Sequence, residues 1–178
     1  MSDLTQIRWH ARAGQGAKTA SQVLALALLR SGKFVQAFPE YGPERRGAPL
    51  RAYTRASSLP IRRHDAIEHP DAVVVLEPSL ASEANLVEGL VPDGVVILNA
   101  DVAPGELSGE RVICVPASDL ASERGSGFAN LTMLGAVAAT LGEPTLDAVQ
   151  DAAVEVLGAK VDASEVRAAV REGYECLR

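Results

Sequence analysis

Short apolar runs recur along the chain, separated by segments whose apolar residues follow a helical spacing. The clearest runs, AVVVL and VVILN, are apolar throughout instead of alternating apolar with polar positions. Such continuous runs are typical of strands that are buried on both faces of a parallel sheet. The strands that we predict lie at residues 5–10, 33–38, 50–55, 72–77, 95–99 and 111–116.

Helical segments are expected between these strands. The one at residues 16–31 is apolar on nearly every side, which indicates burial, and Gly32 ends it. Ser79, Thr145 and Ser164 are the expected N-caps of later helices, because their hydroxyl groups accept hydrogen bonds from the free N–H groups at a helix start. These later helices are expected at residues 78–90, at residues 127–141, at residues 145–157 and after Ser164.

Strands that alternate with helices predict an α/β fold. We expect a three-layer α/β/α sandwich, with a mostly parallel sheet covered by helices on both faces, as a single domain over residues 1–178. The helix at residues 127–141 has apolar or small residues on every face, more than one sheet face can cover. Part of it, or of the loop at residues 39–49, is therefore expected in an interface with a partner subunit.

The charges of the chain are unevenly spread. Residues 1–63 hold eleven Lys or Arg and three Asp or Glu, whereas residues 64–178 hold six and twenty. The basic third suggests an anionic ligand, although pairing with the acidic remainder explains it as well. Nucleic acid is not an expected partner, because the basic part has few aromatic residues to stack on bases.

The sequence also argues against several kinds of site and against membrane association. Cys114 and Cys176 are the only cysteines, too few for an iron–sulfur cluster, which needs four thiolates. No metal site and no catalytic triad are predicted, and His10 is expected to be a hydrogen-bonded structural residue. The first residues are polar and no membrane-length apolar run follows, so we expect no membrane association and a cytoplasmic location.

A glycine-rich stretch, WHARAGQGAKTA, lies between the first strand and the first helix. A nucleotide-binding P-loop needs glycine where Arg12 and Ala17 stand, so this motif is rejected. The dinucleotide-binding fingerprint needs glycine where Ala11 and Ala13 stand, and no acidic residue follows at the spacing of a ribose ligand. The stretch is therefore a weak match for a site that binds NAD.

An anion site at the helix start requires fewer specific residues than either of these motifs. Backbone N–H groups and the positive end of the helix attract an anion, and Lys18 adds a formal charge. A tight corner without a ligand is the alternative. In the loop PEYGPERRGAP, Arg46 suits a carboxylate or a phosphate, or else pairs with Glu44. The candidate binding residues are Gly14, Gln15, Gly16, Lys18, Thr19 and Arg46.

Four stretches, in order along the chain, carry a family resemblance. RWHARAGQGAKTAS, QAFPEYGPERRGAP, YTRASSLPI and NLTMLGA span about residues 5–140. They resemble the gamma subunit, or gamma domain, of pyruvate:ferredoxin oxidoreductase in the 2-oxoacid:acceptor oxidoreductase family. That family usually has glycine where Ala11 and Ala13 stand. RRGAP and RWHARAGQGAKT look more like the pyruvate type than the 2-oxoglutarate or indolepyruvate types.

The resemblance implies an α/β sandwich that takes part in coenzyme A binding and in subunit assembly. Enzymes of the family decarboxylate a 2-oxo acid on thiamine diphosphate, pass electrons through iron–sulfur clusters to ferredoxin or flavodoxin, and transfer the acyl group to coenzyme A. Thiamine diphosphate and the clusters are implied in alpha, beta and delta-type partner subunits, so this chain carries no catalytic residue and is inert alone. The alternative is a stand-alone module that binds a nucleotide or acyl-coenzyme A without enzyme partners.

Overall fold

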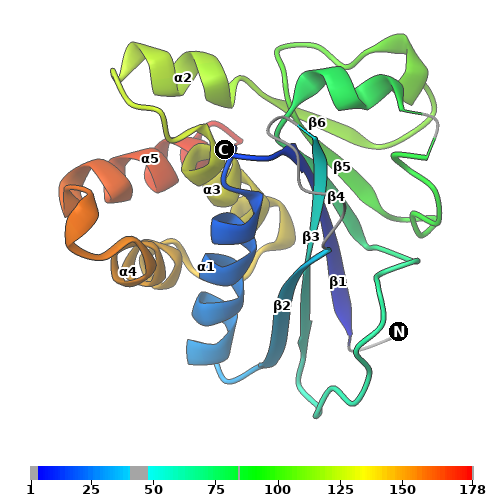
Figure 1. Ribbon diagram of the computed structural model, residues 1–178, viewed down its shortest axis with the longest axis horizontal. Helices are drawn as coiled ribbons and strands as arrows, with labels where there is room; N and C mark the ends of the chain where they lie inside the picture. Colours follow the sequence, from blue (N-terminus) through cyan, green and yellow to red (C-terminus); the bar gives the residue numbers. More distant parts are fainter. Residues whose placement is uncertain (1–3, 41–47, 84, 178) are drawn as a thin grey trace.

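The computed structural model describes residues 4–40, 48–83 and 85–177 of the chain. Its centre is a six-stranded sheet with the order β2-β3-β1-β4-β5-β6 (Figure 1). Each predicted strand is present, and β1, which comes first in the chain, lies in the middle of the sheet. The strands are β1 (Thr5–Arg12), β2 (Phe34–Glu40), β3 (Pro49–Ser57), β4 (Ala72–Val75), β5 (Val95–Asn99) and β6 (Val112–Val115).

The sheet is parallel on one side of β1 and antiparallel on the other. β1 runs parallel to β4, and β4, β5 and β6 continue in the same direction. On the other side, β1 pairs with β3 and β3 pairs with β2, both antiparallel. A short connection joins β2 to β3, which allows a hairpin but not the long crossover that a parallel pair needs. The mostly parallel sheet is therefore confirmed, with this hairpin as its antiparallel edge.

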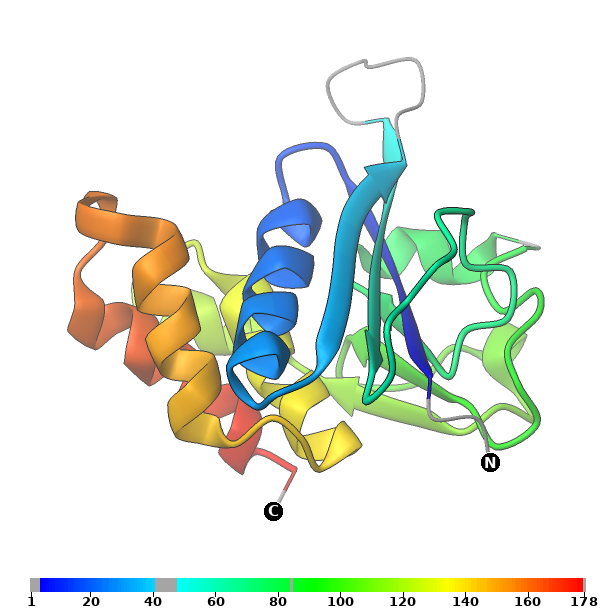
Figure 2. The same ribbon diagram turned by 90° about the horizontal axis from the view of Figure 1, so that it is seen from below.

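Helices cover one face of the sheet in two tiers (Figure 2). The inner helices α1 and α3 pack on the strands, and α4 and α5 pack outside them. The main apolar core lies between the inner helices and strand residues such as Trp9, Val74 and Ile97. The short helix α2, between β6 and α3, was not predicted from the sequence. The helices are α1 (Ala17–Arg30), α2 (Ala117–Glu123), α3 (Ala129–Leu141), α4 (Leu146–Leu157) and α5 (Ala163–Glu175).

The opposite face is covered by turns and by the 3₁₀ helices η1 (Pro78–Ser82) and η2 (Gly105–Leu107) (Figure 2). A second apolar cluster lies between this layer and the sheet. The three-layer sandwich is thus confirmed, with a thinner covering layer on this face. The second cluster consists of Val73, Val75, Leu80, Ala81, Leu86, Val96, Leu98 and Leu107.

The prediction of a helix at residues 78–90 is wrong. The helical part is only η1, which ends at Ser82, and turns follow it. The predicted cap is wrong as well, because the N-cap is Glu77, whose side chain accepts a hydrogen bond from Ser79 N. Pro78 at the first position gives the 3₁₀ helix its start.

Contacts with distant residues shape the turns after η1. Arg8 on β1 donates hydrogen bonds to the carbonyl oxygens of Leu86 and Glu88 at 2.8 and 2.9 Å. Gly89 lies so close to the backbone of Glu68 that a Cβ at this position would be 1.9 Å from the Glu68 oxygen. Helical spacing of the apolar residues does not reveal such contacts, and here they override it.

The helix α3 is buried within the chain itself. Residues 131–138 are all buried, between the sheet and the neighbouring helices. α3 and α5 meet backbone to backbone, so a Cβ on Gly135 would lie 2.0 Å from the oxygen of Val170. The reason given for a subunit interface, that more of this helix is apolar than the chain itself can cover, is therefore wrong for residues 131–138, because α5 covers their outer face. An interface at the partly exposed ends of the helix stays a prediction. The alternative, the loop at residues 39–49, lies mostly outside the described residues.

Side-chain caps begin the last two helices. Thr145 caps α4 as predicted, and its hydroxyl accepts a hydrogen bond from Ala148 N at 3.4 Å. The prediction for α5 is wrong, because the cap is Asp162, whose Oδ1 accepts from Ser164 N at 2.8 Å. A carboxylate at this position also interacts favourably with the positive end of the helix.

Candidate functional site

The glycine turn, residues 13–16, joins the end of β1 to the start of α1. Gly14 and Gly16 have φ angles of 99° and 81°, in the left-handed region that glycine adopts without strain. Among the described residues no other residue type has a positive φ, so Ala11 and Ala13 stand in ordinary conformations. The turn needs glycine at positions 14 and 16, and the two alanines are compatible with it.

The helix α1 begins without a side-chain cap. Gly16 is its N-cap, and the first helical hydrogen bond runs from Ala20 N to Gly16 O at 2.9 Å. The N–H groups of Ala17, Lys18 and Thr19 therefore have no acceptor within the helix. Lys18 is exposed in this first turn, which contains no acidic residue. Free N–H groups, the positive helix end and a lysine together suit an anion.

The two glycines differ in their surroundings. Among the described residues, a Cβ on Gly14 would meet no atom within 4 Å. A Cβ on Gly16 would lie 2.5 Å from Nδ2 of Asn130, at the start of α3. Asn130 also donates a hydrogen bond to Gly16 O at 3.5 Å. Among the described residues, the turn thus has Asn130 as a close neighbour beside Gly16 and no neighbour beside Gly14.

The side chain of Gln15 is used within the turn. Its Oε1 accepts a hydrogen bond from Arg12 N at 2.7 Å, and its Nε2 donates to Glu77 Oε2 at 2.6 Å. Gln15 was selected from the sequence as a ligand contact, whereas the structure shows its side chain bonded to the protein. Glu77 was not selected, although it stands two residues after the end of the buried parallel strand β4, where open sheets place functional groups.

Glu77 stays negatively charged beside the turn. Burial alone would raise the pKa of its carboxyl group, but hydrogen bonds from Ser79 and Gln15 outweigh this effect and lower the pKa. Ser79 Oγ donates to Glu77 Oε1 at 2.8 Å, and Arg12 Nη2 donates to Ser79 Oγ at 3.2 Å. The positive charge of Arg12 also lowers the pKa, so the carboxylate has a nearby countercharge.

The candidate residues fall into one group, except for Arg46. Arg46 and its alternative partner Glu44 lie outside the described residues. Of the described residues next to this gap, Ala48 contacts the glycine turn, because Ala13 N donates to Ala48 O at 3.0 Å. The candidates that the structure brings together are Gly14, Gln15, Gly16, Lys18 and Thr19.

His10 lies on the face of the sheet opposite the helices, the second face, and is 2% exposed. Its Nε2 accepts a hydrogen bond from Arg8 Nε at 3.1 Å. Burial, reinforced by the charges of Arg8 and Arg51, lowers the pKa of His10 to about 3. The ring is therefore neutral at neutral pH and serves as an acceptor for Arg8, the structural role expected for it. A hollow of about 200 Å³ beside it is lined by His10, Glu40, Pro49, Leu50, Arg51, Leu80 and Glu83.

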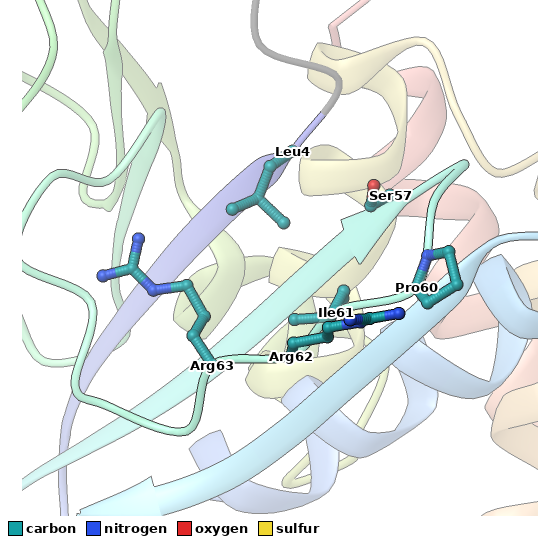
Figure 3. Close-up of a pocket in the computed structure, with 6 residues that line it drawn as sticks. All are labelled: Leu4, Ser57, Pro60, Ile61, Arg62 and Arg63. Carbon is teal, nitrogen blue, oxygen red and sulfur yellow. The ribbon is translucent and has the colours of Figure 1, made fainter.

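A larger hollow lies at the other end of β1, away from the glycine turn (Figure 3). The side chains of Arg62 and Arg63 point in different directions, and Arg63 pairs with Asp65. Because the polar groups do not converge, we do not select this hollow as a ligand site. It measures about 400 Å³ and is lined by Leu4, Ser57, Pro60, Ile61, Arg62 and Arg63.

Other kinds of site are not seen in the described part of the chain. There, no three His, Cys, Asp or Glu side chains come together as a metal site. Cys114 and Cys176 are free, and burial raises the pKa of both thiols. Among residues 4–40, 48–83 and 85–177, no helix has the length and apolar character needed to cross a membrane. The glycine turn is therefore the candidate functional site.

Comparison with known proteins gives a consistent result along the chain. The family described as pyruvate ferredoxin/flavodoxin oxidoreductase matches residues 6–176. Pyruvate synthase subunit PorC of Thermotoga maritima is 45% identical over 180 residues, covering 96% of this chain and 93% of that protein. The pyruvate/ketoisovalerate oxidoreductases common subunit gamma of Pyrococcus furiosus is 38% identical over 179 residues, covering 97% and 96%.

Solved structures have the same fold. The crystal structure of pyruvate oxidoreductase subunit PORC from Thermotoga maritima has a TM-score of 0.83 at 39% identity, over 98% of this chain and 97% of that one. A 2-oxoglutarate:ferredoxin oxidoreductase from Magnetococcus marinus, with 2-oxoglutarate, coenzyme A and succinyl-CoA bound, has a TM-score of 0.78 at 22% identity. The likeness covers 99% of this chain and 30% of that longer one, and at this identity it concerns the fold alone.

Proposed function

The chain belongs to the pyruvate ferredoxin/flavodoxin oxidoreductase family, and from this premise we propose that it is the gamma-type subunit of a 2-oxoacid:ferredoxin oxidoreductase. Pyruvate is the favoured 2-oxo acid, because both relatives described above carry pyruvate in their names. In this proposal the subunit binds coenzyme A and takes part in assembly of the complex, which oxidatively decarboxylates the 2-oxo acid to acyl-coenzyme A.

The other cofactors belong to partner subunits in this proposal. Thiamine diphosphate and the iron–sulfur clusters are assigned to alpha, beta and delta-type subunits, and ferredoxin or flavodoxin accepts the electrons. The two cysteines of this chain are fewer than the four thiolates of a cluster. We assign the complex to the cytoplasm.

The uncapped start of α1 beside two left-handed glycines is the observation that carries the coenzyme A assignment. Coenzyme A contains a pyrophosphate, an anion of the kind that free N–H groups at a helix start bind. In the proposal, the pyrophosphate lies beside Gly14, close to the N–H groups that begin the helix. Lys18 and Thr19 supply a charge and a hydroxyl group. The Magnetococcus marinus enzyme, which has coenzyme A bound, supports the choice of ligand for this fold.

Kinetics of the reassembled complex test the assignment. Lys18→Met keeps much of the aliphatic stem and removes the charge, and Lys160→Met removes a charge from another exposed position as the control. A charge-assisted contact is worth about 1.5–3 kcal/mol, so the KM for coenzyme A should rise about ten- to a hundredfold in Lys18→Met. Salt should raise the KM of the wild type more than that of Lys18→Met, because one screened interaction is missing from the variant.

The outcome separates the alternatives. If Lys18→Met and Gly14→Ala leave the KM for coenzyme A unchanged in an intact complex, the glycine turn is a structural corner and the assignment is wrong. If the chain alone binds coenzyme A and no partner subunit co-purifies with it, the stand-alone binding module is the better description.

A further inference from the structure

We propose that Gln15 and Glu77 act as a brace that positions the glycine turn for its ligand, so that Glu77 is a positioning residue that does not itself touch the ligand. The brace is the set of hydrogen bonds that joins Arg12, Gln15 and Glu77. The proposal rests on the proposed coenzyme A site and adds a role that residue spacing did not reveal.

Hydrogen bonds close the turn from both sides. Gln15 N donates to Arg12 O at 3.1 Å, and Arg12 N donates to the side-chain Oε1 of Gln15 at 2.7 Å. The last residue of β1 and the middle of the turn are therefore joined twice. Since Gly14, between them, has no side chain to restrict its φ angle, these bonds restrict the conformation of the loop, together with the bonds from Ala13 N to Ala48 O and from Asn130 Nδ2 to Gly16 O.

Glu77 fixes the orientation of the Gln15 amide. A carboxylate only accepts hydrogen bonds, so the NH₂ group of Gln15 must face it, at 2.6 Å, and the amide oxygen must face Arg12 N. Glu77 is itself held by Ser79, whose Oγ donates to its other oxygen at 2.8 Å. The position of the carboxylate thus determines which end of the amide closes the turn.

The brace connects neighbouring strands at the edge of the sheet where a ligand is expected. β1 and β4 are parallel neighbours, so their carboxyl ends lie side by side. The glycine turn leaves β1 toward α1, and η1 leaves β4 on the opposite face of the sheet. The hydrogen bond between Gln15 and Glu77 joins these two segments, which leave the sheet on opposite faces. It therefore orients the glycine turn relative to the sheet as well as relative to α1.

A carboxylate close to an anion site is unfavourable unless it has another function. Any negative ligand bound at the turn is repelled by Glu77 over a short distance. Arg12 offsets part of this charge, since it lowers the pKa of Glu77 and bonds to Ser79. A positioning role explains why a charged acceptor stands here despite the repulsion.

Gln15→Glu in the reassembled complex tests the brace, with Gln22→Glu as the matched control. Both variants add one carboxylate to the same segment, but Gln22 is exposed on α1 and outside the brace. At about pH 8, the introduced carboxylate and that of Glu77 are both charged and cannot bond, so we expect the KM for coenzyme A to rise about tenfold. At about pH 6 the two carboxyl groups share a proton, the donor is restored, and the ratio to the wild-type KM should fall.

A second measurement follows the turn directly. In the full chain, amide exchange at Arg12 N, observed by NMR, should be faster in Gln15→Glu than in Gln22→Glu at about pH 8, because repulsion from Glu77 displaces the introduced carboxylate from Arg12 N. Equal exchange in the two variants, or a raised KM ratio that does not change with pH, would overturn the brace.

The brace and the coenzyme A assignment fail in different ways. If Lys18→Met raises the KM for coenzyme A and Gln15→Glu does not at either pH, the brace is wrong and the ligand assignment stands. If Lys18→Met leaves the KM unchanged while Arg12 exchange responds to Gln15→Glu, the ligand assignment is wrong, and the brace remains as a support of the turn.

Discussion

At the scale of single residues, a buried arginine on the second face of the sheet bonds to neutral groups. Arg8 is 5% exposed, and its guanidinium donates to His10 Nε2 and to the carbonyl oxygens of Leu86 and Glu88. Burial lowers the pKa of Arg8, as expected for a cation removed from water. His10 must be neutral here, because an imidazolium has no lone pair for Arg8 and adds a second positive charge.

The lowered pKa of His10 predicts that the free energy of unfolding decreases in acid. This pKa is about 3 in the folded protein, against an ordinary value of 6.5, so between these pH values the unfolded chain binds a proton that the folded chain does not. The stabilising effect is complete above pH 6.5 and is lost as the pH falls toward 3. It amounts to about 5 kcal/mol at most.

The variant His10→Gln keeps an acceptor for Arg8 but has no proton to bind. We expect its free energy of unfolding to fall less steeply than that of the wild type as the pH decreases through the same window. Urea unfolding at a series of pH values measures both slopes. Identical slopes would show that His10 does not titrate as its burial implies.

The two glycines of the turn should respond differently to alanine. Gly14→Ala adds a methyl group that meets none of the described residues and imposes the strain of a positive φ, about 1–2 kcal/mol of unfolding free energy. Gly16→Ala imposes similar strain and also drives a Cβ to 2.5 Å from Asn130 Nδ2, so we expect roughly 1 kcal/mol more. In an Asn130→Ala background this excess should disappear. Denaturant unfolding of Gly14→Ala and Gly16→Ala, each in the wild-type and in the Asn130→Ala background, measures this excess. An excess that persists without Asn130 would rule out Asn130 as its source.

The sequence predicts the part of the candidate site that depends on local geometry. Gly14, Gly16 and Lys18 are candidates because a glycine-rich turn before a helix is visible over a few residues, and their contact with a ligand stays a prediction. The role of Gln15 was not found, because its partner Glu77 is 62 positions away and lies beside it only after β1 and β4 pair. Arg46 stays a prediction, since it lies outside the described residues.

At the scale of elements, the crossing of α3 and α5 depends on two glycines. A Cβ on Gly135 would lie 2.0 Å from Val170 O, and a Cβ on Gly173 would lie 1.7 Å from Thr132 O. Because these neighbours are backbone atoms, they cannot move aside as a side chain can. The close approach lets α5 cover the apolar outer face of α3.

We expect Gly135→Ala and Gly173→Ala each to destabilise the chain by about 3 kcal/mol, because the helices must separate. Gly127→Ala is the control, since a Cβ at this position meets nothing within 4 Å, and its effect should stay within about 1 kcal/mol. Chemical denaturation compares the three variants. A mild effect at Gly135 or Gly173 would mean that the helix pair tolerates a wider spacing.

The start of α5 offers a second test at this scale. Asp162→Ala removes the acceptor for Ser164 N and Glu165 N, whereas Ser164→Ala removes one donor to Asp162 and leaves these N–H groups bonded. We expect the melting temperature to fall more in Asp162→Ala than in Ser164→Ala. The same hydrogen bonds lower the pKa of Asp162, so its effect is present at neutral pH and is lost in acid. The reverse order of melting temperatures would restore Ser164 as the cap.

Elements were predictable where a continuous apolar pattern decides the structure. The buried strands and the long helices α1, α3 and α4 follow from such patterns. The segment at residues 78–90 also has helical spacing, but Arg8 and the close contact at Gly89 hold it in turns. The short helix α2 has too few residues to show a period. Thus the errors occur where distant residues, or few residues, determine the local conformation.

At the scale of the whole molecule, the apolar clusters on the two faces share one sheet. Neighbouring residues of β4 point to opposite faces, with Val74 in the main core and Val73 and Val75 in the second cluster. Removing either layer would expose one apolar face of the strands that the other layer also covers. We therefore expect the isolated chain to fold without partner subunits and to unfold as one unit.

Trp9 is a suitable probe of this cooperativity, because it is the single tryptophan, is 0% exposed and donates to Thr54 Oγ1 at 3.1 Å. In urea, the red shift of its fluorescence should coincide with the loss of helical circular dichroism. Helical signal lost at a lower urea concentration than the tryptophan shift would mean that the outer helices α4 and α5 unfold separately.

The central place of β1 in the sheet has a consequence for synthesis of the chain. β1, α1, β2 and β3 are made first and contain the whole antiparallel side of the sheet, so they can associate while translation continues. The other edge of β1 must wait for β4, and during this interval its N–H and C=O groups have no strand to pair with. A nascent chain that ends between β3 and β4 should therefore be the species most prone to mispairing with its neighbours on a polysome and most dependent on chaperones.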